Sequence, residues 1–229
     1  MNPSNLSQDF TEGCRLEAEL GRRIVNQAKE LKVKDLVYSS ACAAGVDERV
    51  LHFHSKKLVE MELEKLRTGF RTVQVVRPVW FMENIQSPPF SETVEREKTL
   101  SLPLSPSTRL PVVSVRDVGS LLAEASLDPS LLDEHNHILE ICSEKIAVNE
   151  MASALGLKYR QCEFEKFNES YQQMFHLYEE NRVQPDIDFS HTVLSNILHF
   201  RTFAEKLREG KGSEPPCQEE HASGIGSSR

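Results

Sequence analysis

Residues 71–81, RTVQVVRPVWF, are the stretch that decides the fold. Thr72, Val73, Val75 and Val76 are β-branched, and such side chains favour a β-strand because their restricted χ1 torsions suit a pleated surface. Pro78 has no backbone N–H and is expected to end the strand. The sequence therefore predicts a β-strand here, and the neighbouring segments indicate which kind of sheet it joins.

Helical and extended segments alternate on the N-terminal side of this strand. Apolar residues recur every three to four positions over 13–32, which predicts an amphipathic helix. A short strand is expected at 36–39 and a second helix over 54–67, with Gly69 as its cap. Helix, strand, helix, strand is the order of an α/β protein with a parallel sheet.

The C-terminal half mixes short extended runs with helices. Asp117 is expected to cap a helix over 118–127, because an aspartate side chain accepts hydrogen bonds from the first free N–H groups. Further helices are expected over 167–181 and from about Phe200. These elements predict a smaller C-terminal α+β portion.

Composition and charge are those of an ordinary globular protein. The 229 residues are 39% hydrophobic and carry a formal net charge of −8. This charge argues against direct binding to nucleic acid or to anionic membranes, and no apolar run is long enough to span a bilayer. The five cysteines form no C-x-x-C pair, so neither a metal site nor a disulfide framework is expected. We expect an irregular N-terminus at 1–12, one domain at 13–208 and a disordered tail at 209–229.

A glycine-rich phosphate-binding turn is missing from the sequence. In a doubly wound sheet such a turn follows the first strand, and its glycines let the backbone approach the pyrophosphate of a dinucleotide. The ten glycines form no G-x-G-x-x-G pattern. The sequence thus offers little means of holding a dinucleotide by its phosphates.

His52 and Lys56 are four residues apart in HFHSKKLVE, residues 52–60. Nucleotide-dependent reductases often carry a tyrosine and a lysine at this spacing. An imidazole titrates near neutrality and can move protons, and an ammonium can hold a hydroxyl or a phosphate. The alternative is a polar helix face. Ser39 and Ser40 end the preceding strand, where open α/β sheets place ligand contacts, but the interpretation as polar turn residues is favoured.

Five segments follow one another in the order and spacing of a known family. They are LGRRIVNQAKELKVKDLVYSSA, HFHSKKLVEMEL, TVQVVRPVWFMENI, VSVRDVGSLLAEASLDP and DFSHTVLSNILHFRTFAEKL. The second is similar to an H-x-x-x-K-x-x-V-E segment and the third to an R-x-x-x-F-x-E-N segment. From Asp9 to about Gly210 the chain resembles the NmrA-like family, atypical short-chain dehydrogenase/reductase relatives that act as NADP-sensing regulators.

The resemblance implies an incomplete fold. Family members begin with a βαβαβ half that carries the glycine-rich turn, and this chain looks like a member that lacks it. We therefore expect an incomplete Rossmann-like, doubly wound parallel sheet with the strand at 36–39 at its edge. Unpaired backbone groups invite another chain, so we expect marginal stability alone and a homo- or hetero-oligomer formed through this edge.

The resemblance also places residues along a cofactor, NADP(H). It implies that Lys56 reaches the nicotinamide-side ribose and that the segment after the strand lies along the cofactor. His52 stands where active reductases carry tyrosine, so no catalytic residue is expected. The cofactor-binding residues so implied are Arg22, Lys56, Phe81, Met82, Glu83 and Asn84.

The function implied by the resemblance is regulatory. It is a non-catalytic protein of the redox-sensor type that acts through protein partners in transcription or signalling, in the cytoplasm and the nucleus. Binding of NADP(H) is expected to be weak or absent without the glycine-rich turn. The alternatives are an NAD(P)H-dependent reductase that uses His52 as acid and Lys56 as electrostatic aid, and a translated remnant without a selected function.

Overall fold

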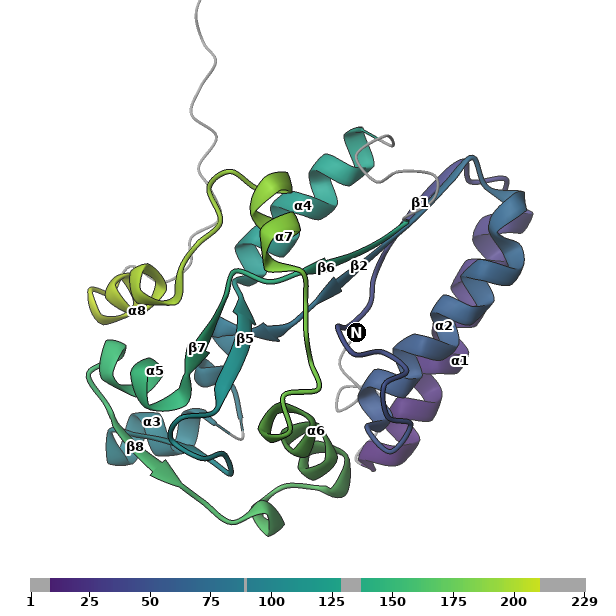
Figure 1. Ribbon diagram of the computed structural model, residues 1–229. Coiled ribbons are helices and arrows are strands. Elements are labelled where there is room, and N and C mark those ends of the chain that lie inside the picture. The colour runs from purple at the N-terminus through teal and green to yellow at the C-terminus, as the bar shows by residue number, and fades with distance from the viewer. Residues whose placement is uncertain (1–8, 89, 129–136, 211–229) are drawn as a thin grey trace, which may run out of the picture.

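The computed structural model describes residues 9–88, 90–128 and 137–210, and it shows an α/β protein with helices on both faces of a parallel sheet (Figure 1). The helices are α1 (Phe10–Glu30), α2 (Leu51–Leu66), α3 (Ser91–Glu97), α4 (Val115–Leu127), α5 (Val148–Ala154), α6 (Glu169–Glu179), α7 (Ile187–Val193) and α8 (Phe200–Arg208). The strands are β1 (Asp35–Ser39), β2 (Thr72–Pro78), β3 (Trp80–Phe81), β4 (Thr99–Leu102), β5 (Arg109–Val113), β6 (Ile138–Ile141), β7 (Glu144–Ala147) and β8 (Lys158–Gln161). Short 3₁₀-helices are η2 (Arg67–Gly69), η3 (Met82–Gln86) and η4 (Phe164–Lys166).

The main sheet has the order β1-β2-β6, and all its strands are parallel. Asp35 pairs with Thr72 at one end of the β1–β2 ladder, and Val75 pairs with Ile138 in the β2–β6 ladder. The segment singled out by its β-branched residues is thus the middle strand, and most of its residues are buried. This confirms the predicted parallel sheet and the predicted strand, and it places that strand at the centre of the sheet.

Helices α1 and α2 cover one face of this sheet (Figure 1). Val25 of α1 and Val59 and Leu63 of α2 form a buried cluster with Val73 and Val75 of β2. Burial of each such side chain contributes about 1.5–3 kcal/mol. The amphipathic pattern of 13–32 is therefore explained by this contact.

Gly21 sets how closely α1 approaches α2. A Cβ atom at this position would lie 2.5 Å from Cγ2 of Val59. Carbon atoms in proteins do not approach so closely, so a side chain here would push the two helices apart. The glycine is required for packing and not for a special backbone conformation.

Helix α4 covers the opposite face of the sheet. Val118 and Leu121 of α4 belong to the same buried cluster as Val76, whose side chain points away from α2 because side chains alternate along a strand. Helices on both faces of a parallel sheet define the doubly wound arrangement. The predicted fold class is thus confirmed.

The C-terminal portion adds two small sheets beside the main one. In the order β3-β5-β7, β3 runs parallel to β5 and β7 runs antiparallel to it, while β4 pairs with β8. Helices α3, α5 and α6 surround these strands (Figure 1). This mixed portion agrees with the expected smaller α+β part.

Three helices begin earlier than the sequence predicts. Residues 10–12 are helical and not irregular, because the Asp9 side chain accepts a hydrogen bond of 2.8 Å from the N–H of Thr11 and caps α1. Helix α2 begins at Leu51, so His52 lies in its first turn. Helix α4 begins at Val115 with Ser114 as its cap, while Asp117 is buried inside the helix and accepts from the N–H of Leu198 at 2.7 Å. Residues 1–8 and most of the expected tail, 211–229, lie outside the described residues.

Candidate functional site

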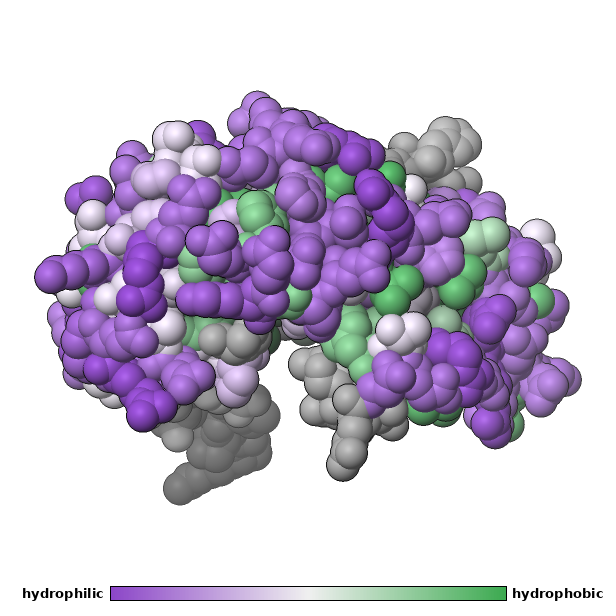
Figure 2. All heavy atoms as spheres, turned by 90° about the horizontal axis from the view of Figure 1, so that it is seen from below, coloured by the Kyte–Doolittle hydropathy of each residue, from purple (hydrophilic) through white to green (hydrophobic). Residues whose placement is uncertain are grey.

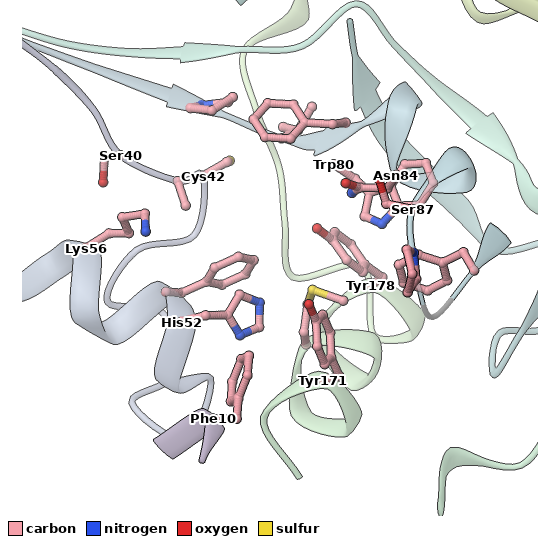
Figure 3. A pocket seen from close by; sticks show the side chains of 18 residues that line it. Phe10, Ser40, Cys42, His52, Lys56, Trp80, Asn84, Ser87, Tyr171 and Tyr178 are labelled. Atoms are coloured by element: carbon pink, nitrogen blue, oxygen red, sulfur yellow. The ribbon is translucent and has the colours of Figure 1, made fainter. Parts of the chain in front are cut away.

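A cavity of about 300 Å³ opens where β1 and β2 end (Figure 3). Parallel α/β sheets commonly place ligand contacts beyond the carboxyl ends of their strands. Residues 40–42 follow β1, residues 78–81 end β2 and form β3, and α2 and α6 supply the facing walls. The lining residues are Phe10, Ser40, Ala41, Cys42, His52, Phe53, Lys56, Pro78, Val79, Trp80, Phe81, Asn84, Ser87, Pro88, Phe90, Tyr171, Met174 and Tyr178.

Lys56 lines this cavity, and its ammonium is paired with a carboxylate from α1. Glu17 forms an ion pair with Lys56 and also accepts a 2.6 Å hydrogen bond from the Ser55 hydroxyl. Only 13% of the lysine side chain and 5% of the glutamate side chain are exposed. A partly buried pair of this kind is energetically coupled, so a ligand that approaches Lys56 must compete with Glu17.

His52 lies in the first turn of α2 among aromatic rings. Its Nδ1 and the Ser170 hydroxyl of α6 share a hydrogen bond of 2.8 Å. The ring centroids of Phe53, Tyr171 and Phe10 lie 4.6, 5.1 and 5.9 Å from that of the imidazole. Burial, together with the smaller effect of the positive charge of Lys56, lowers the pKa of His52 to about 3. The imidazole is therefore uncharged at neutral pH.

Ser40 follows β1 and is engaged with the protein itself. Its hydroxyl donates a 2.6 Å hydrogen bond to Glu60 of α2, and the same carboxylate accepts from Arg77 of β2. Ser39 is exposed. The Ser40 hydroxyl is thus used in a contact within the protein, which agrees with a structural role for this residue.

The segment after β2 divides between the cavity and the protein interior. Phe81, which ends β3 and caps η3, and Asn84 of η3 both line the cavity. Met82 is fully buried in the main core. Glu83 points toward α4, where it accepts a 2.7 Å hydrogen bond from the hydroxyl of Ser114.

Arg22 lies away from the cavity. It is exposed on α1, where its Nε donates a 3.3 Å hydrogen bond to the Ala18 carbonyl one turn earlier. Of the six residues implied as cofactor ligands, the cavity brings together three: Lys56, Phe81 and Asn84.

Sequence reasoning missed the wall supplied by α6. Tyr171, Met174 and Tyr178 of this helix face the cavity (Figure 3). Their spacing of three and four residues indicates one helix face, which in a sequence looks the same as a face buried in the core. Phe10 of α1 was missed because the irregular N-terminus was expected to include it.

The family model for the NmrA-like family matches residues 8–207 of the chain. The chain belongs to the NmrA-like family. Comparison of the sequence with curated proteins finds no significant match.

Solved structures share the NmrA-like fold at low sequence identity. NmrA, a negative transcriptional regulator in complex with NADP, is 15% identical with a TM-score of 0.65, over 83% of this chain and 69% of that chain. The Citrobacter sp. triphenylmethane reductase complexed with NADP(H) is 13% identical with a TM-score of 0.65, over 84% and 72%. A nucleoside-diphosphate-sugar epimerase from Staphylococcus aureus is 14% identical with a TM-score of 0.63, over 81% and 69%. Regulators and enzymes thus share this fold.

The NmrA-like family implies NADP(H), and the cavity fits this cofactor only in part. Its aromatic lining suits a flat ring, but its lysine is already paired with a glutamate. No glycine-rich phosphate-binding turn stands anywhere in the sequence. The described residues therefore offer no glycine-rich turn for the pyrophosphate of a dinucleotide.

Residues 9–88, 90–128 and 137–210 contain no helix that is both long and apolar enough to cross a bilayer. No three His, Cys, Asp or Glu side chains in these ranges gather closely enough to hold a metal ion.

Proposed function

We propose that this chain is a non-catalytic NmrA-like regulator that acts through protein partners and binds NADP(H) weakly. The observation that carries this proposal is that both polar residues of the H-x-x-x-K segment are engaged within the protein. Lys56 is paired with Glu17, and His52 is buried, uncharged and hydrogen-bonded to Ser170. Reduction of a carbonyl needs a proton donor to the carbonyl oxygen, and an uncharged imidazole, whose remaining N–H is a very weak acid, serves this role poorly.

Isothermal titration calorimetry of the purified chain with NADPH tests this proposal. We expect no binding of micromolar or better affinity, and binding of that strength would contradict the proposal. Glu17→Gln should bind NADPH more tightly than the wild type, because it releases the lysine from its ion pair. Glu19→Gln is the matched control, since this exposed carboxylate on the same helix forms its ion pair with the exposed Arg15 and lies outside the cavity lining.

We infer that the free edge of β1 is the surface that partners use, a second copy of the chain among them. The N–H of Ser40 donates to the Val76 carbonyl, and the N–H of Thr72 donates to the Lys34 carbonyl. Backbone groups alternate along a strand, so the even-numbered residues face β2 and the odd-numbered ones face away from it. Within the described part of the chain β1 pairs with β2 alone. Figure 2 shows hydrophilic side chains over most of one face, with only scattered hydrophobic patches, which favours the strand edge over that face as the docking surface.

Size-exclusion chromatography with light scattering at several concentrations tests the role of this edge. We expect association that rises with concentration and that Val37→Pro weakens. The N–H of Val37 faces away from β2, so proline at this edge position removes a group that a partner would use and none that β2 uses. A wild type that stays monomeric and melts like an ordinary stable domain would contradict the proposal.

The second candidate is an NADPH-dependent reductase. It is favoured by one observation: two phenols, those of Tyr171 and Tyr178, line the same cavity as Lys56 and offer proton donors from α6. NADPH consumption against a panel of quinones, present in the wild type and absent in Lys56→Ala, would support this candidate. No consumption by either protein would reject it.

A further inference from the structure

Two tyrosines of α6 present their hydroxyl groups to the cavity. Figure 3 shows Tyr171 and Tyr178 pointing from α6 toward its middle. Tyr178 is only 4% exposed. Among the described residues, neither phenolic oxygen has a hydrogen-bond partner in the protein, whereas Tyr159 outside the cavity donates to the carbonyl oxygens of Leu102 and Leu104.

A phenol group that faces a cavity can take its hydrogen-bond partner from the molecule that fills the cavity. A tyrosine hydroxyl in the protein interior usually finds a hydrogen bond. Neither phenolic oxygen is among the buried atoms sealed off without a partner, so both are accessible from the cavity. On the facing wall, the side-chain amide of Asn84 also has no hydrogen-bond partner among the described residues, and it offers both a donor and an acceptor.

The rest of the lining excludes a charged ligand. The ammonium of Lys56 is neutralised by Glu17, and the imidazole of His52 is uncharged. The surrounding walls are aromatic, with Phe53, Phe90 and Trp80 among them. Burying an unpaired charge among such rings is strongly unfavourable, while flat apolar rings stack on them favourably.

We propose that this cavity binds an uncharged, flat aromatic compound of one or two rings that carries a carbonyl oxygen, and that the Tyr178 hydroxyl donates a hydrogen bond to that oxygen. A volume of about 300 Å³ is at the lower end of the range for small-molecule pockets, which limits the ligand to this size. The ligand binds by itself, without a dinucleotide. The inference therefore goes beyond the proposed function and can fail separately from it.

Coumarin, a neutral two-ring compound with one carbonyl group, is the probe for the first test. Trp80 is the only tryptophan of the chain and lines the cavity, so its fluorescence reports binding, with calorimetry as the second readout. Naphthalene has the same two rings without the carbonyl oxygen, and coumarin-3-carboxylate adds a charge. We expect coumarin to bind about five- to tenfold more tightly than naphthalene and coumarin-3-carboxylate not to bind.

Tyr178→Phe tests the hydrogen bond itself. It should weaken coumarin binding about five- to tenfold and leave naphthalene binding unchanged. Tyr159→Phe removes a phenol that does not reach the cavity and should leave both unchanged. Equal binding of coumarin and naphthalene to the wild type would overturn the inference even if Tyr178→Phe fails to fold, as would tight binding of the carboxylate. Because the test contains no NADPH, its outcome is independent of the NADPH titration.

Discussion

Replacing Arg77 with methionine is expected to lower the free energy of unfolding by about 3 kcal/mol. The guanidinium of Arg77 on β2 donates to both oxygens of the Glu60 carboxylate on α2, from Nε at 2.8 Å and from Nη2 at 2.6 Å. Only 14% of the arginine side chain and 5% of the glutamate side chain are exposed. Methionine retains much of the apolar stem but leaves the carboxylate without its bidentate partner.

The expected loss of about 3 kcal/mol in the free energy of unfolding follows from the contacts that Glu60 keeps in Arg77→Met. Removing one member of a buried ion pair costs about 3–5 kcal/mol. The lower end applies here, because the Ser40 hydroxyl still donates at 2.6 Å and the ammonium of Lys57 lies 3.4 Å away. Since whole domains are stable by only about 5–15 kcal/mol, this single change is expected to be visible in any unfolding experiment.

The Arg77–Glu60 ion pair also predicts how the stability of the fold depends on pH. Burial by itself would raise the pKa of Glu60, but hydrogen bonds from Arg77 and Ser40 outweigh burial and hold the pKa below its usual value. A lowered folded-state pKa stabilises the fold above the unfolded-state pKa, and this stabilisation is lost as the pH falls through the folded-state pKa. In Arg77→Met burial dominates and raises the pKa of Glu60. The difference in stability between variant and wild type should therefore narrow as the pH falls from neutral toward about 5.

Urea unfolding, monitored by circular dichroism at neutral pH and at about pH 5, measures both the loss of stability and its pH dependence. Arg96→Met is the matched control, because the Arg96–Glu92 pair is 75% and 71% exposed and should contribute less than about 0.5 kcal/mol. Adding Glu60→Gln to Arg77→Met should recover part of the loss, since a neutral amide is less costly to bury than a carboxylate. Equal losses in Arg77→Met and Arg96→Met would refute the reasoning.

Further predictions concern packing, titration and thiol reactivity. Gly21→Ala should destabilise the fold by about 1–3 kcal/mol in thermal melts, because its Cβ would clash with Val59, whereas Gly119→Ala has open space and should be neutral or stabilising. Burial lowers the pKa of His52 to about 3, so stability should fall by up to about 1.4 kcal/mol per pH unit below pH 6.5, and His52→Gln should flatten this dependence in urea titrations. The buried thiol of Cys42, whose pKa is raised by burial, should not react with a thiol reagent in the native protein.

Each of these three predictions has a result that would contradict it. Equal melting temperatures for the two glycine variants would show that the helices adjust without cost. A pH dependence unchanged by His52→Gln would assign the titration to other groups. Rapid labelling of Cys42 in the folded protein would contradict the expected inertness of this buried thiol.

Local patterns in the sequence were sufficient for the main elements. The β-branched run at 72–76 predicts the central strand, and the three-to-four-residue spacing over 13–32 predicts α1, because each pattern reflects which face of an element is buried. Their alternation indicates the parallel sheet, and motif order indicates the family. The first residues of the helices were predicted less well. Ser114 and Asp117 are both suitable N-caps for α4, and only the backbone geometry selects Ser114. The cap of α1, Asp9, lies in a polar segment that was expected to be irregular.

The candidate site depended on contacts between residues far apart in the chain. Lys56 and Glu17 are separated by 39 positions, and His52 and Ser170 by 118, so no local pattern links either pair. The sequence by itself determined the fold class, the family and the place of Lys56 on a helix. Only the tertiary structure decided that its lysine is neutralised, that its histidine is uncharged and that α6 closes the cavity with two phenols. The physical reason is that charge state and hydrogen bonding depend on burial and on neighbours, which only the packed chain brings together.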